Sequence, residues 1–498
     1  MTLKNNYFLV FISSLLMGLS QQPVYLGFLS WFCLVPFIYV VFNEQSFKKN
    51  IFFSLFWGFV YHLVILFWIS TNIGTSFIIA IITMLISVLI MTLNTLLIYL
   101  LWNRISRFFI KYRFVLFVVV WVSVEFIRSY GLLGFPWVSL ANSQIDYFYL
   151  IQNSEITGIY GISFWILLVN VYLYKTIFID KKNIKILILV FLFPWISGYI
   201  LYKNALYVNN DENYFIKYSI LQPNINLFSK RNISDKDKNL EKLIATSQQC
   251  IKFNNSDLVI WPESAIPFHR LQYKRDRENI INRLLFSNNS MLLTGNIFKE
   301  NNRTYNSSVL LNQHGLVDVY HKRQLVPLAE HVPLSDIIKP LQNINVGGAN
   351  FSKGKIDKIF TINDISFTSM ICYESTFPEI NRRHVNMGAD ALVYLVNDGW
   401  YLNPPEPQQH ARQSIYRAIE NRRPVIRCAN TGISLIINEL GIVENKIELN
   451  EEGHMSSILY KKNKKTFYTK FGNVFSLILL IVSSIFFIMT FIKNEKKK

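Results

Sequence analysis

Residues 369–375 (SMICYES) place Cys372 where an apolar run ends and passes into a polar turn. A strand that leads into a tight turn exposes a nucleophile beside free backbone N–H groups. The nucleophilic form of cysteine is the thiolate, which a nearby cation or base stabilises or generates. A small cysteine packed in an apolar core would show the same local pattern. This stretch alone does not separate the two interpretations.

Two further motifs place a carboxylate and a cation at the ends of other apolar runs. In residues 258–264 (LVIWPES), a proline that cannot extend a β-ladder precedes Glu263. A carboxylate beside apolar neighbours has a raised pKa and can accept a proton. In residues 320–333 (YHKRQLVPLAEHVP), Lys322 could hold an oxyanion and Glu330 could orient that lysine. The alternatives are a surface glutamate that opens a loop and a solvated basic loop.

Glutamate, lysine and cysteine in this order, each at the end of an apolar run, resemble the nitrilase-like carbon–nitrogen hydrolase superfamily. A fourth apolar run leads into residues 397–400 (NDGW). Three more segments support the resemblance, namely 408–410 (QQH), 417–420 (RAIE) and 430–432 (NTG).

Composition divides the 498-residue chain near residues 202–213. Only 16% of the residues are charged, against about 25% in soluble proteins, and the deficit lies in residues 1–205. The net charge of +18 comes from basic residues between apolar runs and at the C-terminal end, a distribution typical of membrane proteins. We expect no nucleic-acid partner, because no RNA-binding or phosphate-binding motif accompanies the charge. The spacing suggests neither a disulfide framework nor a metal site for the four cysteines, Cys33, Cys250, Cys372 and Cys428.

Apolar runs in the first part of the chain predict membrane-spanning helices, since a bilayer core needs about 20 apolar residues. A cleaved signal peptide at the first run is disfavoured because no clear cleavage site follows. The sequence predicts eight spans, at roughly 7–21, 25–43, 52–71, 76–102, 113–127, 161–178, 184–203 and 472–492.

Basic residues alternate between the predicted loops, which sets the orientation. The second, fourth and sixth loops are rich in Lys and Arg, whereas the first and third have none and the fifth has only Arg128 at its edge. Because basic loops stay in the cytoplasm, we predict that the globular part is outside and that the basic tail, Lys496–Lys498, is inside. Residues 134–137 (GFPW) in the fifth loop suit an interfacial or re-entrant segment, or a simple connection.

Residues 215–460 alternate β-rich runs with helix-like stretches, which predicts an α/β layered sandwich. Strands are expected at 218–221, 258–261, 291–294, 307–311, 367–371 and 391–396, and helices at 235–253 and 408–421. The predicted architecture is therefore an α-helical membrane domain of seven helices in 1–205, a catalytic α/β domain in 215–460, and an eighth membrane helix in 472–492.

With the membrane segments added, the chain resembles the apolipoprotein N-acyltransferase family over nearly its whole length. Matching segments include 134–137 (GFPW), 161–164 (GISF) and 305–307 (YNS). The resemblance implies that Glu263 is the general base, Lys322 the oxyanion-stabilising cation and Cys372 the nucleophile. It implies supporting or substrate-binding positions for Glu330, Tyr373, Glu374, Asn306 and Trp400, and neither a metal nor a cofactor.

Three departures from the family pattern fall in lid or substrate-contact regions. Leu328-Ala329 stands where Phe-Gly is usual, residues 227–231 (LFSKR) lack a common tryptophan, and Tyr401 replaces a phenylalanine. All three leave the Glu-Lys-Cys set intact.

The resemblance implies a two-step acyl transfer through a Cys372 thioester. The expected donor is a phospholipid, and the expected acceptor is the free α-amine of the diacylglyceryl cysteine that begins an apolipoprotein. The expected setting is a monomer in a bacterial inner membrane, with the catalytic domain in the periplasm. A membrane-anchored amidase that releases the acyl group to water is the alternative, although one anchor would suffice for it. A transporter with a degenerate enzyme domain is disfavoured by the intact residue set.

Overall fold

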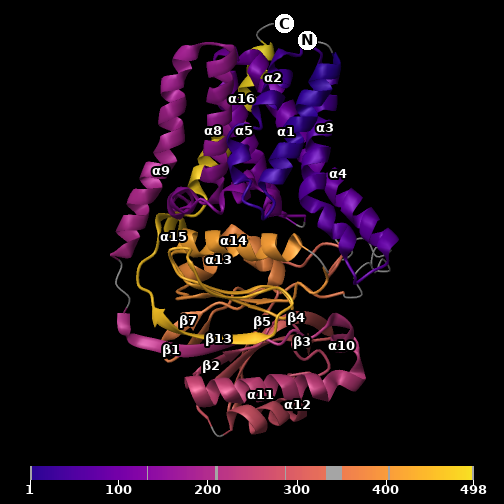
Figure 1. Cartoon of the computed structure of the whole chain (residues 1–498), viewed down its shortest axis with the longest axis vertical. Coiled ribbons are helices and arrows are strands. Elements are labelled where there is room, and N and C mark those ends of the chain that lie inside the picture. The colour runs from indigo at the N-terminus through magenta and orange to yellow at the C-terminus, as the bar shows by residue number, and fades with distance from the viewer. Residues whose placement is uncertain are drawn as a thin grey trace. The chain divides into compact units, whose positions relative to one another are not determined.

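The chain forms two compact units in a computed structural model (Figure 1). The structure describes residues 3–131, 133–207, 211–286, 288–332, 350–401 and 404–495. The helical unit contains Met1–Thr71, Ser76–Leu206 and Phe471–Lys498, and the α/β unit contains Asn72–Thr75 and Tyr207–Lys470. The predicted basic tail, Lys496–Lys498, and the end of the lysine motif at Pro333 lie outside the described residues.

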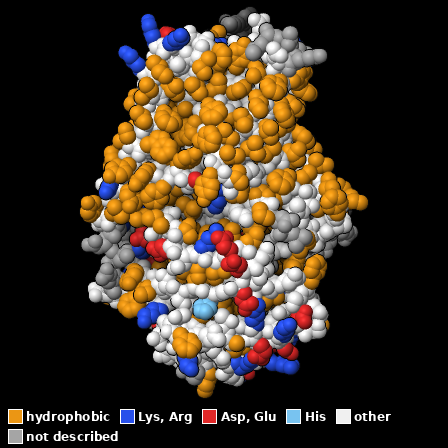
Figure 2. Space-filling model, in the orientation of Figure 1, with side chains coloured by type: hydrophobic (Ala, Val, Ile, Leu, Met, Phe, Trp, Pro, Cys, Tyr) orange, Lys and Arg blue, Asp and Glu red, His pale blue; other side chains and the backbone are white. Residues whose placement is uncertain are grey.

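The helical unit is built from apolar helices, and apolar side chains cover it on the face shown in Figure 2. Within the described part of the chain, five segments are long and apolar enough to cross a membrane: Phe47–Thr71, Phe77–Phe108, Ile159–Phe178, Lys181–Leu206 and Val474–Lys493. The helices are α1 (Leu3–Ser20), α2 (Val35–Asn43), α3 (Phe47–Leu66), α4 (Phe77–Phe108), α5 (Arg113–Arg128), α6 (Phe148–Ile151), α7 (Ser154–Thr157), α8 (Ile159–Phe178), α9 (Ile184–Leu206) and α16 (Val474–Glu495).

Three of the eight predicted spans correspond to shorter helices, α1, α2 and α5. The predicted span 25–43 is divided into a 3-10 turn, Gly27–Trp31, and α2. Pro36 lies in the first turn of α2, where its missing N–H leaves no helical bond unmade. The number of spans and the orientation therefore stay predictions.

The α/β unit contains two main sheets and a small hairpin (Figure 1). The strand order is β13-β1-β2-β3-β4-β5 in the first sheet and β12-β11-β10-β9-β8 in the second, and β6 pairs with β7. The strands are β1 (Asp211–Gln222), β2 (Leu258–Ile260), β3 (Met291–Glu300), β4 (Arg303–Asn312), β5 (Gly315–His321), β6 (Phe360–Ile362), β7 (Ile365–Phe367), β8 (Met370–Ile371), β9 (Leu392–Val396), β10 (Val425–Ala429), β11 (Ser434–Ile437), β12 (Val443–Ile447) and β13 (Gly453–Lys461).

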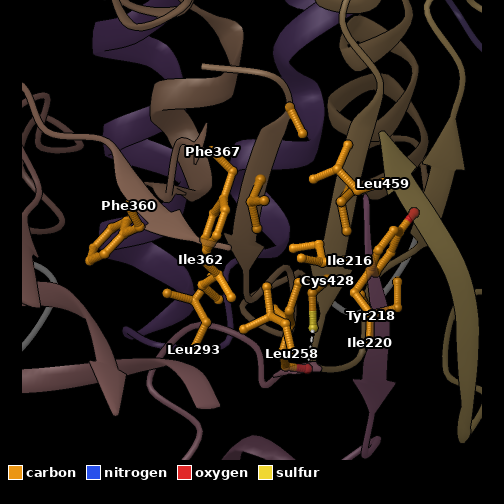
Figure 3. Close-up of a cluster of buried hydrophobic side chains, with 14 of the residues drawn as sticks. Ile216, Tyr218, Ile220, Leu258, Leu293, Phe360, Ile362, Phe367, Cys428 and Leu459 are labelled. Atoms are coloured by element: carbon orange, nitrogen blue, oxygen red, sulfur yellow. Dashed lines mark hydrogen bonds between the residues drawn. The ribbon is translucent and has the colours of Figure 1, made fainter. Parts of the chain in front are cut away.

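The two sheets share a core of alternating apolar side chains. Ile216 and Ile220 of β1 belong to the same buried cluster as Val393 and Leu395 of β9 (Figure 3 shows part of it). The other face of the first sheet is covered by α11 (Lys236–Asn254), and α14 (Glu406–Asn421) packs on the second sheet beside α13 (Pro378–Asn386). These α, β, β and α layers confirm the predicted α/β layered fold.

One predicted strand is divided in the structure. Residues 367–371 were expected to be continuous, but β7 ends at Phe367 and β8 begins at Met370. Between them, the Thr368 hydroxyl accepts a hydrogen bond from the backbone N–H of Val393 at 3.0 Å. This side-chain bond occupies a place in the ladder where a backbone carbonyl would otherwise accept, so the strand is interrupted before the cysteine.

Candidate active site

Glu263 lies in a buried turn that directly follows β2. Its side chain is buried, with 6% of the residue exposed, and its Oε1 accepts a hydrogen bond from Asn306 Nδ2 at 2.7 Å. Gly295 of β3 packs so closely against this turn that a Cβ there would lie 2.6 Å from Glu263 Cα. The position of the carboxylate therefore depends on a glycine in the neighbouring strand.

Lys322 follows β5 and joins two carboxylates. It is 1% exposed, and its Nζ lies 2.9 Å from the Glu330 carboxylate and 3.8 Å from Glu263 Oε1. Asn306 Nδ2 also donates to Glu330 Oε1 at 2.9 Å, so Lys322 and Asn306 both bridge the two acids. The backbone N–H of Val326 donates to Glu330 Oε2 at 2.9 Å, which fixes the loop that carries the lysine.

The electrostatics of this cluster keep a base and a cation side by side. Burial raises the pKa of Glu263, while the ammonium group of Lys322 opposes that rise. Burial alone would lower the pKa of Lys322, but Glu330 and Glu263 outweigh it and raise the pKa. Lys322 therefore stays charged, and Glu263, with its raised pKa, accepts a proton more readily than an ordinary carboxylate.

Cys372 differs from the other cysteines in exposure and in backbone conformation. It is partly exposed, whereas Cys33, Cys250 and Cys428 are buried. It is the first residue of a 3-10 turn that begins where β8 ends, and its φ of 51° lies in the left-handed region. Burial raises the pKa of the Cys372 thiol well above its usual value. The charge of Glu263 adds to this rise, and the charge of Lys322 opposes it. A base is therefore needed to generate the thiolate.

Glu374 connects the cysteine turn to the lysine loop. Its Oε2 accepts from the backbone N–H of Ile371 at 2.9 Å, and its Oε1 accepts from Tyr320 Oη at 2.8 Å and from the backbone N–H of Arg323 at 2.7 Å. The carboxylate thus links the residue before Cys372 to the residue after Lys322. These contacts hold the cysteine turn and the lysine loop together.

Tyr373 and Trp400 occupy different surroundings. The Tyr373 ring is buried edge-on against Phe377, with centroids 4.9 Å apart. The backbone oxygen of Trp400 accepts from the N–H of Ile73 at 2.9 Å, and a Cβ on Gly74 would lie 2.7 Å from the Trp400 ring. The structure thus joins Glu263, Lys322, Glu330 and Asn306 in one bonded cluster, with which Cys372 interacts electrostatically.

Lys230 is a further residue of the site, and the sequence motifs do not predict it. It lies in α10 (Leu227–Arg231), is only 4% exposed, and donates from Nζ to the backbone oxygen of Glu263 at 2.9 Å. Burial lowers the pKa of Lys230 to about 8, and the Glu263 carboxylate opposes this effect. A lysine in a polar segment looks like a solvated lysine, so no local sequence pattern predicts this burial.

Among the described residues, one group has the side chains and spacing of a metal site. The Cys372 sulfur, an Asp398 oxygen and a His410 nitrogen all lie within 4.8 Å of one another. However, Asp398 Oδ1 accepts from His410 Nδ1 at 3.0 Å, and Asp398 Oδ2 accepts from Arg427 Nη2 at 2.8 Å. His410 Nε2 lies 3.0 Å from Ser375 Oγ. The Asp398 and His410 atoms are already paired with protein groups, so the arrangement fits a hydrogen-bond network better than a metal centre.

Models of known protein families match parts of both units. The model "Apolipoprotein N-acyltransferase N-terminal domain" matches residues 13–172, and the model "Carbon-nitrogen hydrolase" matches residues 217–461. A protein of Rickettsia typhi named apolipoprotein N-acyltransferase is 30% identical over 493 residues, which is 95% of each chain. A protein of Chlorobaculum tepidum with the same name is 28% identical over 506 residues, or 94% of this chain and 93% of the relative.

Proposed function

Because the chain belongs to the apolipoprotein N-acyltransferase family, we propose that it transfers a fatty acyl chain from a phospholipid to the α-amine of the N-terminal lipid-modified cysteine of an apolipoprotein. The observation that carries this proposal is the buried Lys322, held between Glu263 and Glu330 beside a partly exposed cysteine in a left-handed turn. A carboxylate, a cation and a thiol are the groups that acyl transfer through a thioester requires.

In the first step, Cys372 takes the acyl group from the phospholipid. Glu263 accepts the thiol proton, and the sulfur attacks the ester carbonyl carbon. The tetrahedral oxyanion is stabilised by the charge of Lys322 and by a backbone N–H, that of Tyr373. When the intermediate collapses, the carbon–oxygen bond breaks, the lysophospholipid leaves with the proton from Glu263, and a thioester remains on Cys372.

In the second step, the acceptor amine takes the acyl group from Cys372. The amine attacks the thioester carbonyl, Glu263 accepts the amine proton, and the thiolate leaves as an amide forms. The thiolate then regains a proton from Glu263, so each step returns the enzyme groups to their starting state.

The helical unit supports a location at a lipid surface, since its long apolar helices suit a bilayer. We place the protein in a bacterial inner membrane with the α/β unit on the periplasmic side, as the loop charges indicate. The proposed partners are therefore a phospholipid donor, a diacylglyceryl apolipoprotein acceptor and the bilayer, and we propose that the enzyme acts as a monomer.

The test is incubation of the purified full-length protein with phospholipid, followed by mass spectrometry of the Cys372 peptide. An acyl adduct is expected, and it should disappear when a diacylglyceryl peptide with a free α-amine is added, with an N-acylated peptide as the product. The variant Cys372→Ala should form neither adduct nor product. An N-acylated peptide from that variant would exclude Cys372 as the nucleophile, and free fatty acid in place of the peptide product would favour the amidase alternative.

A further inference from the structure

The left-handed conformation of Cys372 needs a partner that holds it. A residue with a Cβ is disfavoured at positive φ, and such residues persist only where surrounding contacts fix them. Glu374 fixes the backbone on the side of Ile371. The carbonyl oxygen of Cys372, on the other side, accepts from Ser375 Oγ at 2.8 Å and lies 3.3 Å from His410 Nε2.

Ser375, His410 and the Cys372 carbonyl form a closed set of short polar contacts. Ser375 Oγ lies 3.0 Å from His410 Nε2. Because the Asp398 carboxylate can only accept, the Nδ1 proton of His410 is donated to it at 3.0 Å, and Nε2 keeps a lone pair for the Ser375 hydroxyl. The single hydroxyl proton of Ser375 therefore has two possible acceptors, the Cys372 carbonyl oxygen and His410 Nε2.

Asp398 and its partners keep His410 in place. His410 and Asp398 are 1% and 3% exposed, and Arg427 Nη2 donates to Asp398 Oδ2 at 2.8 Å. Gly432 packs directly on this carboxylate, because a Cβ there would lie 2.3 Å from Asp398 Oδ2. Other charges that face the imidazole are Glu406, whose Oε1 lies 3.7 Å from Nδ1, and Arg427. Burial, together with the positive charge of Arg427, lowers the pKa of His410, so the ring is neutral near pH 7.

We propose that His410, oriented by Asp398, is a positioning residue that acts through Ser375 on the Cys372 backbone and fixes the direction of the sulfur. The inference rests on the proposed function, because it takes Cys372 to be the nucleophile. His410 does not exchange protons with the substrate. Its role is to keep the thiol aimed at the place where Glu263 can take the proton and the acyl carbonyl can be attacked.

The test compares His410→Gln with a matched histidine control in the full-length protein. His384 on α13 is also buried, and its Nδ1 contacts the carbonyl of Ile380. We expect His410→Gln to lower the rate of acyl-enzyme formation about 10- to 100-fold, with KM for phospholipid unchanged. His384→Gln should form the acyl-enzyme at the wild-type rate, with a thermal midpoint similar to that of His410→Gln.

Two further measurements separate positioning from other roles. The pH at which acylation falls on the acid side should stay the same in His410→Gln, because Glu263 remains the base. Ser375→Ala should reduce the rate, and the double variant should be no slower than His410→Gln alone. Wild-type acylation by His410→Gln, a moved acid limb, or additive losses in the double variant would each overturn the inference. A wild-type protein that forms no acyl-enzyme at all would instead refute the proposed function.

Discussion

Replacement of Lys322 by methionine removes the cation between two buried carboxylates. Methionine is similar in length and apolar, so the change removes the charge and keeps most of the volume. The Glu263 carboxylate loses a positive charge at 3.8 Å, and Glu330 loses one at 2.9 Å. We expect acyl-enzyme formation at neutral pH to fall far more than packing alone would explain.

The size of the effect follows from the distance between Nζ and Glu263 Oε1. Two unit charges about 4 Å apart attract by about 4 kcal/mol at an effective dielectric constant of about 20. At about 1.4 kcal/mol for each factor of ten, the ionised fraction of Glu263 falls by up to about a thousandfold, and the full factor applies at a pH below both its wild-type and its new pKa. Since only ionised Glu263 can take the thiol proton, acylation falls with it. Loss of the oxyanion contact reduces the rate further.

The assay is the rate of acyl-enzyme formation from a labelled phospholipid, measured across a pH series. Burial already raises the pKa of Glu263, and Lys322 opposes that rise. Removal of Lys322 raises the pKa further, so the acid limb of the rate profile should move to higher pH. Lys242→Met is the control, because Lys242 pairs with Glu452 at 2.7 Å on the surface and should leave the profile unchanged. An acid limb that stays at the wild-type pH in Lys322→Met would refute the proposed coupling.

Three other changes test the surroundings of the site. Lys230→Met should also move the acid limb of acylation to higher pH, because Lys230 lowers the pKa of Glu263, whereas Lys230→Arg should retain most of that effect; equal profiles for both variants would contradict it. Gly295→Ala should lower the thermal midpoint and the acylation rate, since the new Cβ would lie 2.6 Å from Glu263 Cα; a wild-type midpoint and rate would show that the turn adapts. Glu374→Ala should cost about 2–4 kcal/mol in thermal or denaturant unfolding, because it leaves several backbone N–H donors unpaired, and an unchanged stability would show that other acceptors replace it.

Strong local periodicity made much of the α/β unit predictable from the sequence. The expected strand 291–294 lies in β3 and the expected helix 235–253 corresponds to α11, because each carries its own apolar pattern. The strands after β9, namely β10 to β13, were not among the predicted strands. β12 is almost wholly exposed, so its residues lack the apolar alternation that would mark a strand, and its place is set by pairing with β11.

Predictability of the site depended on whether a residue's environment is local. Glu263, Lys322 and Cys372 stand at the ends of apolar runs, and that position gave the signal. Lys230 can be recognised as a site residue only in the folded chain, since its contact with Glu263 joins residues 33 positions apart. The contact of His410 with the Cys372 turn joins residues 38 positions apart and depends on how α14 packs on the second sheet. No local pattern specifies such contacts.

The pairing of β1 with β13 has a consequence for how the α/β unit is assembled. Residues Phe215 and Tyr460 are register partners, although about half of the chain separates them. During synthesis, β1 is complete long before its outer neighbour exists, so the outer edge of β1 stays unpaired until residue 461 is available. A chain that stops before β13 would leave that edge unpaired, and an unpaired edge strand invites association with other chains. The outer side of the long strand β1 is therefore covered only when the last strand of the unit has been made.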